Sequence, residues 1–471
     1  MAVSDDRSRC DISAVLGGAG LPGETVAAWL AGAGAIGGDY QADADRFSRQ
    51  WRLGDDLLQK LPRKPQRTAQ EAAAAALLLE CDRMSRERFL ARHAEAVYRR
   101  LTNDCAGFKR IESLVLDAAA LLPGLTPDTK RLAAERGIPQ RDKDGVEIDQ
   151  GIFLARVLAH PVVGAHLCHA MLLPRAEALE RRDEYFSGGT LELEGATLER
   201  RGHASFITLR NPRFLNAEDE ATLDGFEIAA DLAILDPSSD IVVVRGAAVD
   251  HPKFRGKRLF SAGINLTHLY HGRISYLWYM RRDMGVVNKI YRGVARPDIG
   301  PEEIYGGTTE KPWIAAVDGF AIGGGCQILL VTDYVLAASD AYLTLPARKE
   351  GIIPGASNMR LWRFTGDRIA RQAILYGRRL DCDTPEGRLV CDEVVPPVAL
   401  DDALAKVVDG FASSGVVSAA GNRRAIRVGQ EPLDLFRSYM AVYAREQAYC
   451  HFSPALIANL ERHWGAQNRT P

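Results

Sequence analysis

The stretch WIAAVDGFAIGGGCQ, residues 313–327, combines a strand signal with a glycine turn. Its first five residues are apolar and indicate a buried strand, and the turn that follows opens directly into a helix-like segment. Small residues leave the backbone N–H groups of such a turn uncovered, and the start of a helix adds a partial positive charge. The stretch therefore predicts a place where backbone amides face one ligand oxygen.

Another glycine turn, FSAGINL at residues 260–266 (the first turn), lies about 60 positions before the turn at residues 318–327 (the second turn). Either turn alone is also compatible with an ordinary glycine connection. Two backbone amides that converge on one acyl oxygen form an oxyanion hole, which stabilises a developing enolate. Both turns in this order favour an enzyme that acts on an acyl group.

Strand and helix signals alternate on either side of these turns. Strands are expected at residues 204–209 and 334–338, and a helix at residues 221–235. Residues 241–244 (IVVV) form a continuous β-branched run, which is typical of a strand buried on both faces. The alternation predicts an α/β core of stacked β-α units over residues 191–399.

The flanking regions have helical patterns. Residues 69–101 are rich in Ala, Leu, Glu and Arg with apolar positions three and four apart, and residues 152–184 are similar. The Ser-Gly-Gly sequence at residues 187–189 marks a domain boundary. We expect a helical N-terminal domain over residues 1–190 and a helical, oligomer-forming C-terminal region over residues 400–471.

The composition excludes several classes of protein. The chain has 471 residues, 46% of them hydrophobic, which suits two or three packing units. Lys and Arg number 59 and Asp and Glu 61, so the net charge of −2 offers no basic excess for a nucleic-acid partner. The polar start and the lack of an apolar run of about 20 residues argue against a secretory signal and a membrane partner. Eight scattered cysteines without a Cys-x-x-Cys pair favour reduced thiols in a cytoplasm.

Three features resemble functional motifs but have simpler interpretations. Residues 18–23 and 32–37 match G-x-G-x-x-G without the preceding strand that a dinucleotide site requires, so we expect loops. His166 and His169 are spaced for one helix face, but no carboxylate completes a metal site, and we expect no metal. The arginine pair at 281–282 fits a substrate or subunit contact better than nucleic acid.

Together these residues resemble the crotonase (enoyl-CoA hydratase/isomerase) superfamily over residues 191–400. The resemblance implies a spiral of β-β-α turns, a CoA-thioester substrate, and an oxyanion hole formed by the N–H groups of Ile264 and Gly324. It also implies that Gly323 and Gly325 lie against the acyl group. Besides the two glycine turns it rests on ITL, NP and LNA within residues 207–217, Thr332-Asp333, and GIIPG at residues 351–355. By the same resemblance the CoA moiety would be held by Arg213, Leu215, Ala217 and Ala262.

Two positions depart from the hydratase pattern. Hydratases of this superfamily carry a Glu three residues after the oxyanion glycine and another directly after the Pro of a Pro-Glu pair. Gln327 and Ala347 occupy these positions here. Neither an amide nor a methyl group shuttles a proton at neutral pH, so we expect enolate stabilisation without water addition.

The helical N-terminal region, the aromatic insert over residues 267–311 and the GGGCQ variant resemble one subgroup, the 3,5-dihydroxyphenylacetyl-CoA 1,2-dioxygenases of glycopeptide-antibiotic biosynthesis. This resemblance implies oxidation of the aryl-acetyl-CoA by O2 to 3,5-dihydroxyphenylglyoxylate, with release of CoA and without a metal or an organic cofactor. The product would supply the amino acid dihydroxyphenylglycine. Membership of the superfamily would further imply a homotrimer or a hexamer built as a dimer of trimers.

Three side chains are candidates for the acyl pocket. Gln327 lies where the superfamily's catalytic acid lies, so it is expected to face the acyl group as a catalytic residue. Glu218 could accept a hydrogen bond from a ring hydroxyl, or be a solvated carboxylate at a helix start. Arg282 could hold a ring hydroxyl or a CoA phosphate, or make a surface salt bridge.

Two other functions fit the same residues. An acyl-CoA thioester hydrolase or isomerase would keep the fold and the oxyanion hole. A non-catalytic CoA-binding scaffold would explain the loss of both glutamates, although the retained glycine turns argue against it.

Overall fold

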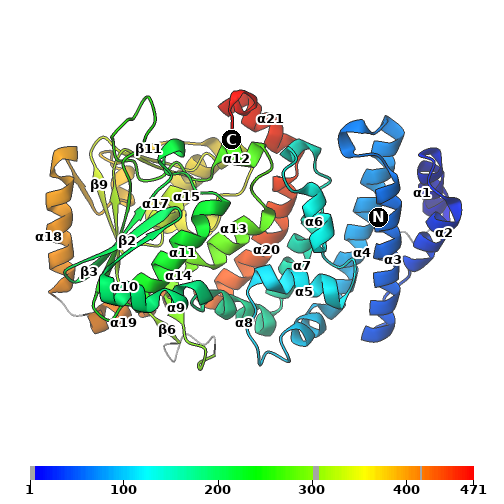
Figure 1. Cartoon of the computed structure of the whole chain (residues 1–471), viewed down its shortest axis with the longest axis horizontal. Coiled ribbons are helices and arrows are strands. Elements are labelled where there is room, and N and C mark those ends of the chain that lie inside the picture. The colour runs from blue at the N-terminus through cyan, green and yellow to red at the C-terminus, as the bar shows by residue number, and fades with distance from the viewer. Residues whose placement is uncertain (1–5, 301–306, 414–415) are drawn as a thin grey trace. The chain divides into compact units, whose positions relative to one another are not determined.

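The computed structural model contains two compact units (Figure 1). The first comprises the chain up to Leu167 together with Met440–Phe452, and the second comprises Cys168–Tyr439 and Ser453–Pro471. The predicted α/β core with an added helical N-terminal region and C-terminal helices is confirmed. The described residues are 6–300, 307–413 and 416–471, so the polar start and residues 301–306 of the aromatic insert lie outside them.

Helices build the first unit. Those that lie wholly within it are α1 (Asp6–Gly18), α2 (Gly23–Gly32), α3 (Tyr40–Lys60), α4 (Ala69–Leu101), α5 (Ile111–Leu121), α6 (Thr129–Glu135) and α7 (Ile148–Ala159). The longest, α4, covers the segment predicted as helical, and a capping box between Thr68 and Glu71 closes its first turn. Phe89 of α4 packs edge-on against Trp51 of α3 with ring centroids 5.5 Å apart, so an aromatic contact joins these two helices.

The helical pattern of residues 152–184 is interrupted. The sequence predicts one stretch, but Pro161 and Pro174 separate α7 from α8 (Pro161–Leu172) and α8 from α9 (Ala176–Glu180). A further break at Arg181, which involves no proline, separates α9 from α10 (Arg182–Gly188). α9 packs against α11 (Glu220–Leu235), and α10 packs against β1 (Thr190–Leu193). The chain therefore enters the second unit after Leu167 rather than at the predicted boundary of residue 190.

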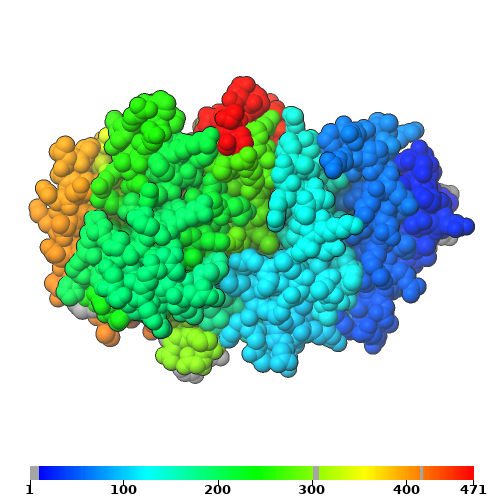
Figure 2. All heavy atoms as spheres, viewed as in Figure 1, coloured from blue at the N-terminus to red at the C-terminus, as the bar shows by residue number. Residues whose placement is uncertain are grey.

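A seven-stranded sheet lies at the centre of the second unit, in the order β1-β2-β3-β4-β7-β9-β12. The first three strands are antiparallel, and the strands from β3 onward pair in parallel. β4 is buried at all six positions, as its β-branched run predicts, and α11 packs on β2 and β3. The segment with α10 and the first three strands forms the front of this unit in the space-filling view (Figure 2). The bounds beyond β1 are β2 (Ala196–Arg201), β3 (Ala204–Leu209), β4 (Ile241–Gly246), β7 (Trp313–Val317), β9 (Tyr334–Ala338) and β12 (Glu393–Val395).

The glycine turn after β7 contains a short strand that the sequence does not predict. Phe320–Ile322 form β8, which pairs in parallel with β10 (Tyr342–Thr344) in a second sheet that β11 (Leu380–Asp381) completes. Only after β8 does α15 (Gly324–Leu329) begin. This strand fixes the direction in which the turn approaches α15.

The aromatic insert forms α12 (Leu266–Tyr270), α13 (Tyr276–Met284) and α14 (Val286–Arg292), followed by β5 (Val294–Ala295), which pairs with β6 (Thr308–Thr309). Among the described residues no single helix is long and apolar enough to cross a membrane, although two bent pairs of consecutive helices reach that length and hydropathy jointly. The later helices are α16 (Ala347–Glu350), α17 (Ser357–Arg371), α18 (Leu400–Ala412), α19 (Val416–Gln430), α20 (Leu433–His451) and α21 (Pro454–Trp464).

Candidate active site

The two glycine turns lie side by side. A parallel bridge joins Ser261 to the second turn, and the Ile322 N–H donates a hydrogen bond to the Ser261 carbonyl oxygen over 3.0 Å. Gly263 has a φ of +77°, and a Cβ atom there would lie 2.6 Å from the Ile322 carbonyl oxygen and 2.9 Å from the Gly324 nitrogen. Only glycine permits this approach, so the contact between the turns explains why glycine is found at position 263.

The N–H groups of Ile264 and Gly324 both remain available. Ile264 forms a parallel bridge with Glu218, and the hydrogen bonds of that bridge use Gly263 O and Asn265 N, so the Ile264 N–H points away from it. Gly324 is the first residue of α15, where an N–H has no partner inside the helix. Within the part of the chain that the structure describes, neither N–H donates to another group, so both can bind a ligand oxygen.

Glu218, Arg282 and Gln327 form one buried cluster. Arg282, on α13, donates to both carboxylate oxygens of Glu218 over 2.7 and 2.9 Å and to Gln327 Oε1 over 2.7 Å. It also donates to the carbonyl oxygen of Gly324 over 2.8 Å. Arg282 is 2% exposed and Glu218 is 6% exposed, which excludes the surface salt bridge and the solvated carboxylate. Arg282 thus holds the side-chain carbonyl of Gln327 and also contacts Gly324, one of the two residues predicted to form the oxyanion hole.

Gly355 closes the cluster on one side. Its φ is +48°, and a Cβ atom there would overlap Gln327 Oε1 and lie 2.6 Å from Asp283 Oδ1. Asp283 Oδ1 is also 3.6 Å from Arg282 Nη1. The Tyr439 hydroxyl donates to the Gly355 carbonyl oxygen, and burial raises the pKa of Tyr439 above its usual value. Sequence reasoning missed Asp283 and Tyr439, since only the adjacency of Asp283 to Arg282 could have pointed to either.

A cavity of about 670 Å³ adjoins the first turn. Its lining includes all four residues predicted to hold CoA, together with Ile264, whereas Glu218, Arg282 and Gln327 are not part of it. Sequence reasoning missed the lining residues from other segments, because only the fold brings those segments together. They include the cations Lys253 and Arg469 and the aromatic residues Phe254 and Trp464.

The loop that carries the predicted CoA residues has an unusual backbone. Leu215 and Asn216 have positive φ angles of +57° and +56°, which residues other than glycine rarely adopt. The Asn216 side chain donates to the carbonyl oxygens of Ala247 and Leu259, each over 2.8 Å. These hydrogen bonds hold the loop in the strained conformation that places Leu215 at the cavity.

The two flanking glycines, Gly323 and Gly325, have different surroundings. A Cβ atom at Gly325 would lie 2.9 Å from the Cβ of Ser261, so Gly325 packs against the first turn. Gly323 has a φ of +50° and open space beside its Cα, the nearest atom to a Cβ being Gly263 Cα at 3.9 Å. Gly325 thus has a packing role beside the first turn, and the predicted acyl contacts of Gly323 and Gly325 both stay predictions.

Comparison with known proteins gives two levels of similarity. The family model described as enoyl-CoA hydratase/isomerase matches residues 302–431. The chain is 46% identical over 395 residues to a (3,5-dihydroxyphenyl)acetyl-CoA 1,2-dioxygenase of Amycolatopsis orientalis, which covers 84% of this chain and 89% of that protein. It is 27% identical over 243 residues to a short-chain-enoyl-CoA hydratase of Clostridium acetobutylicum, which covers 51% of this chain and 84% of that protein.

A solved structure is similar to the chain over a shorter stretch, like that of the short-chain-enoyl-CoA hydratase. The crystal structure of an enoyl-CoA hydratase from Mycobacterium avium subsp. paratuberculosis K-10 is 21% identical and superposes with a TM-score of 0.48. The alignment covers 57% of this chain and 98% of that one. The dioxygenase is thus similar to most of the chain, whereas the short-chain-enoyl-CoA hydratase is similar to about half of it.

Proposed function

The chain belongs to the enoyl-CoA hydratase/isomerase (crotonase) superfamily, and from this premise we propose that it is a dioxygenase which converts 3,5-dihydroxyphenylacetyl-CoA and O2 to 3,5-dihydroxyphenylglyoxylate and CoA. The observation that carries the proposal is the 46% identity, over 84% of the chain, to a dioxygenase with that substrate. The replacement of both hydratase glutamates by Gln327 and the buried Ala347 supports it, because water addition then lacks its acid and its base.

The oxyanion hole would act on the thioester carbonyl. Loss of an α-proton leaves negative charge on that oxygen, and the N–H groups of Ile264 and Gly324 stabilise it more strongly than they stabilise the neutral thioester. The substrate's own aryl ring spreads the remaining charge, so a weaker base suffices than in an unactivated acyl-CoA. The side chains of Ile264 and Ile322 are apolar, and a dry acyl pocket would protect the enolate from protonation by water.

The oxidation balances without a further reactant. The enolate α-carbon reduces O2 and forms a C–O bond, and the distal peroxide oxygen attacks the thioester carbonyl carbon and expels the CoA thiolate. Loss of the second α-proton then accompanies cleavage of the O–O bond, which leaves a ketone and a carboxylate. Both oxygen atoms of O2 enter the product, and the two α-hydrogens leave as protons. No metal or organic cofactor takes part in this scheme.

The cavity beside the first turn suits the CoA moiety. Arg213, Lys253 and Arg469 are cations at its wall that can pair with phosphates, and Phe254 and Trp464 offer ring surfaces for an adenine. The cavity extends to Ile264, so a pantetheine arm that leaves it reaches the oxyanion hole. The acyl group would then lie next to the buried cluster.

Glu218 would recognise the resorcinol ring. Each of its carboxylate oxygens accepts one hydrogen bond from Arg282 and keeps a further lone pair, which a ring hydroxyl can use. A buried carboxylate held by a two-point contact is well oriented for this purpose. Gln327, fixed through its carbonyl oxygen, would direct its NH2 group at the acyl group.

The proposed assembly is a homotrimer or a hexamer built as a dimer of trimers. Crotonase-fold relatives are typically oligomeric, and the chain supplies C-terminal helices from α18 onward that could make such contacts. An acyl-CoA is the proposed small-molecule partner, and neither nucleic acid nor membrane is required.

An oxygen electrode tests the proposed reaction. Purified protein, stripped of metal with a chelator, is mixed with 3,5-dihydroxyphenylacetyl-CoA while O2 uptake, free thiol and product mass are recorded. We expect one O2 consumed for each CoA released, with 3,5-dihydroxyphenylglyoxylate as the product. Release of CoA without O2 uptake would indicate a thioester hydrolase, and lack of turnover with any CoA thioester would favour a binding scaffold.

A further inference from the structure

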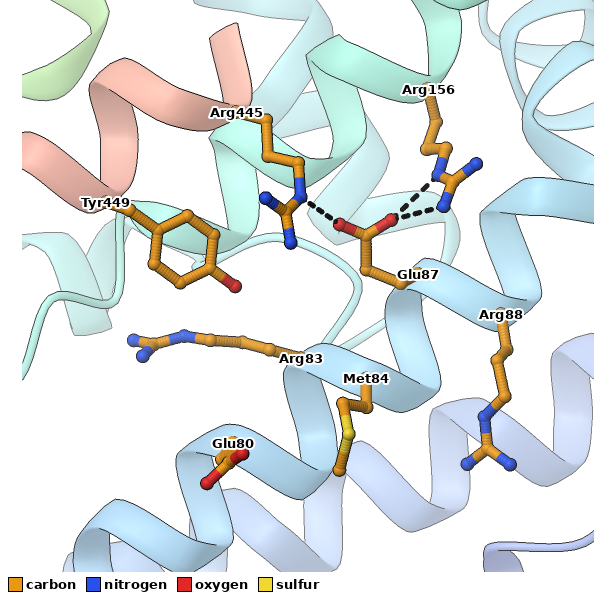
Figure 3. A pocket seen from close by; sticks show the side chains of 8 residues that line it. All are labelled: Glu80, Arg83, Met84, Glu87, Arg88, Arg156, Arg445 and Tyr449. Atoms are coloured by element: carbon orange, nitrogen blue, oxygen red, sulfur yellow. Dashed lines mark hydrogen bonds and ion pairs between the residues drawn. The ribbon is translucent and has the colours of Figure 1, made fainter. Parts of the chain in front are cut away.

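A second cavity lies within the helical first unit. It has a volume of about 770 Å³, which is within the range of sites for small organic ligands, and it is lined by residues of α4, α7 and the 440–452 segment of α20 (Figure 3). Arginine dominates its wall, and none of its residues takes part in the proposed reaction. The lining residues are Glu80, Arg83, Met84, Glu87, Arg88, Arg156, Arg445 and Tyr449.

One carboxylate organises part of this wall. The Arg445 Nε donates to Glu87 Oε1 over 2.8 Å, and the Arg156 Nε and Nη2 lie 2.8 and 2.6 Å from Glu87 Oε2. Figure 3 shows the two guanidinium groups approaching Glu87 from opposite sides. Glu87 thus fixes both arginines while leaving further N–H donors of each guanidinium unused.

Arg88 has no such partner. Among the described residues no carboxylate or carbonyl oxygen pairs with its guanidinium, and its Nε atom is buried without a hydrogen bond. A buried donor without a partner is costly, and such a group in a native protein calls for a ligand or a water. Arg88 is therefore a point at which a ligand could complete this cavity, and the buried Nε atom of Arg83 likewise lacks a hydrogen bond.

Positive charge predominates among the residues that line this cavity. Asp149 lies 3.7 Å from Arg83 and 3.4 Å from Arg86, and Glu446 accepts a hydrogen bond from Arg445. The lining itself holds four arginines (83, 88, 156 and 445) and two glutamates (80 and 87), while Asp82 and Asp55 lie near Arg86 behind it. A negatively charged ligand would offset the excess of arginine on this wall.

The cavity also offers surfaces for an apolar ring. The Arg445 guanidinium lies over the Tyr449 ring, 5.0 Å from the ring centroid. The Met84 thioether lies on α4, one turn before Arg88. Both groups form favourable contacts with aromatic ligands. We propose that this cavity binds a small aromatic carboxylate, with the carboxylate at Arg88 and the ring between Met84 and Tyr449. This proposal does not depend on the proposed reaction.

Three probes separate the charge from the ring. Benzoate carries both, benzamide lacks the charge, and acetate lacks the ring. Saturation-transfer NMR titrations of the full-length protein should give saturable binding of benzoate, with benzamide and acetate each weaker by about tenfold or more.

Variants identify the site. Arg88→Gln and Arg445→Gln should each weaken benzoate binding by about tenfold, because each removes a charged donor. Arg92→Gln is the matched control, since Arg92 is exposed on the same helix and outside the cavity. Thermal melts check that each variant is folded. Lack of saturable benzoate binding, or benzoate affinity that Arg88→Gln leaves unchanged, would overturn the proposal.

Discussion

The side chain at position 327 separates this chain from the hydratases. An amide stands where a carboxylate would relay protons, and Arg282 holds its carbonyl oxygen at 2.7 Å. The same guanidinium binds Glu218 and the Gly324 carbonyl oxygen. One arginine therefore connects the Gln327 amide, the buried Glu218 carboxylate and the glycine turn that contains Gly324. The cluster is suited to hold an enolate in place without returning a proton to it.

Gln327→Glu tests this role. The new carboxylate would add negative charge beside the forming enolate, so kcat for O2 uptake should fall by about tenfold or more. The exposed Gln430→Glu, which makes the same chemical change away from the cluster, should leave kcat unchanged. Equal oxygenation rates for Gln327→Glu and the unaltered protein would show that residue 327 does not face the acyl group.

Gly355→Ala tests the wall behind Gln327. The added methyl group would overlap Gln327 Oε1 and crowd Asp283, so we expect the amide to move and O2 uptake to fall by about tenfold or more. Gly366→Ala is the control, because Gly366 also has a positive φ, of +73°, but open space around its Cα.

Both alanine variants should lose about 1–3 kcal/mol of stability from backbone strain. Only Gly355→Ala should lose activity, which thermal melts and oxygen uptake measured on the same samples would show. If the two variants kept equal activity, contact with Gly355 would have no part in placing Gln327.

Single residues of the candidate site could be predicted from the sequence only where they belong to a recognisable motif. The resemblance assigns Ile264 and Gly324 by their places in the glycine turns; the structure leaves both N–H groups available, and their part in an oxyanion hole stays a prediction. Asp283 and Tyr439 could not be found in this way, because they come from the insert and from α20, far from either turn. Burial of Glu218 and Arg282 was likewise undetermined, since only tertiary packing decides whether a charged residue is covered.

At the scale of elements, the strongly patterned segments were predictable and the interrupted ones were not. The IVVV run gave a fully buried strand, and residues 69–101 gave one long helix. Residues 152–184 gave several helices, because the prolines override an otherwise helical composition. β8 was missed, as three residues carry too little periodicity to indicate a strand.

The helix α15 is too short to supply much of the positive charge that we expected at the predicted oxyanion hole. It has six residues, so its macrodipole is small and the free N–H of Gly324 itself is the main donor. The parallel bridge at Ser261 and the approach of Gly263 hold that N–H in place. The predicted oxyanion hole would therefore depend on the geometry of the two turns rather than on the helix.

The short helix α16 carries a buried carboxylic acid. Burial raises the pKa of Glu350 to about 7. Above pH 7 the folded state must hold a buried charge there, whereas below about pH 4 the carboxyl is protonated in both the folded and the unfolded states. Its destabilising effect is therefore absent at low pH, grows between about pH 4 and 7, and is complete above pH 7.

Glu350→Gln should accordingly raise the free energy of unfolding by up to about 3 kcal/mol at pH 8 and by much less at pH 5. Melting temperatures at the two pH values check this. The exposed Glu180→Gln should show no such difference between pH 8 and pH 5. A gain for Glu350→Gln that did not depend on pH would contradict a raised pKa at this position.

At the scale of the whole molecule, the division into two units differs from the predicted one. The first unit takes up Met440–Phe452, a segment that sequence order places with the C-terminal helices. Such a return depends on contacts between residues about 300 positions apart, which no local pattern encodes. The second unit begins earlier than expected for the same reason, since α9 and α10 are held by contacts with α11 and β1.

The proposed assembly is tested by analytical ultracentrifugation. Sedimentation of the full chain at micromolar concentration should give a species of three or six subunits, each of 51.5 kDa. Superfamily relatives set this expectation, and C-terminal helices on the second unit supply surfaces for it. A protein that stayed monomeric at every concentration measured would contradict the proposed trimer or hexamer.

Labelling with oxygen-18 tests the proposed reaction most directly. Metal-free protein is allowed to turn over 3,5-dihydroxyphenylacetyl-CoA under 18O2, and the product is reduced at once with borohydride so that its ketone oxygen does not exchange with water. We predict two labelled oxygen atoms in each product molecule and one CoA released for each O2 consumed. Unlabelled 3,5-dihydroxyphenylacetate, formed with release of CoA, would contradict the account and identify a hydrolase.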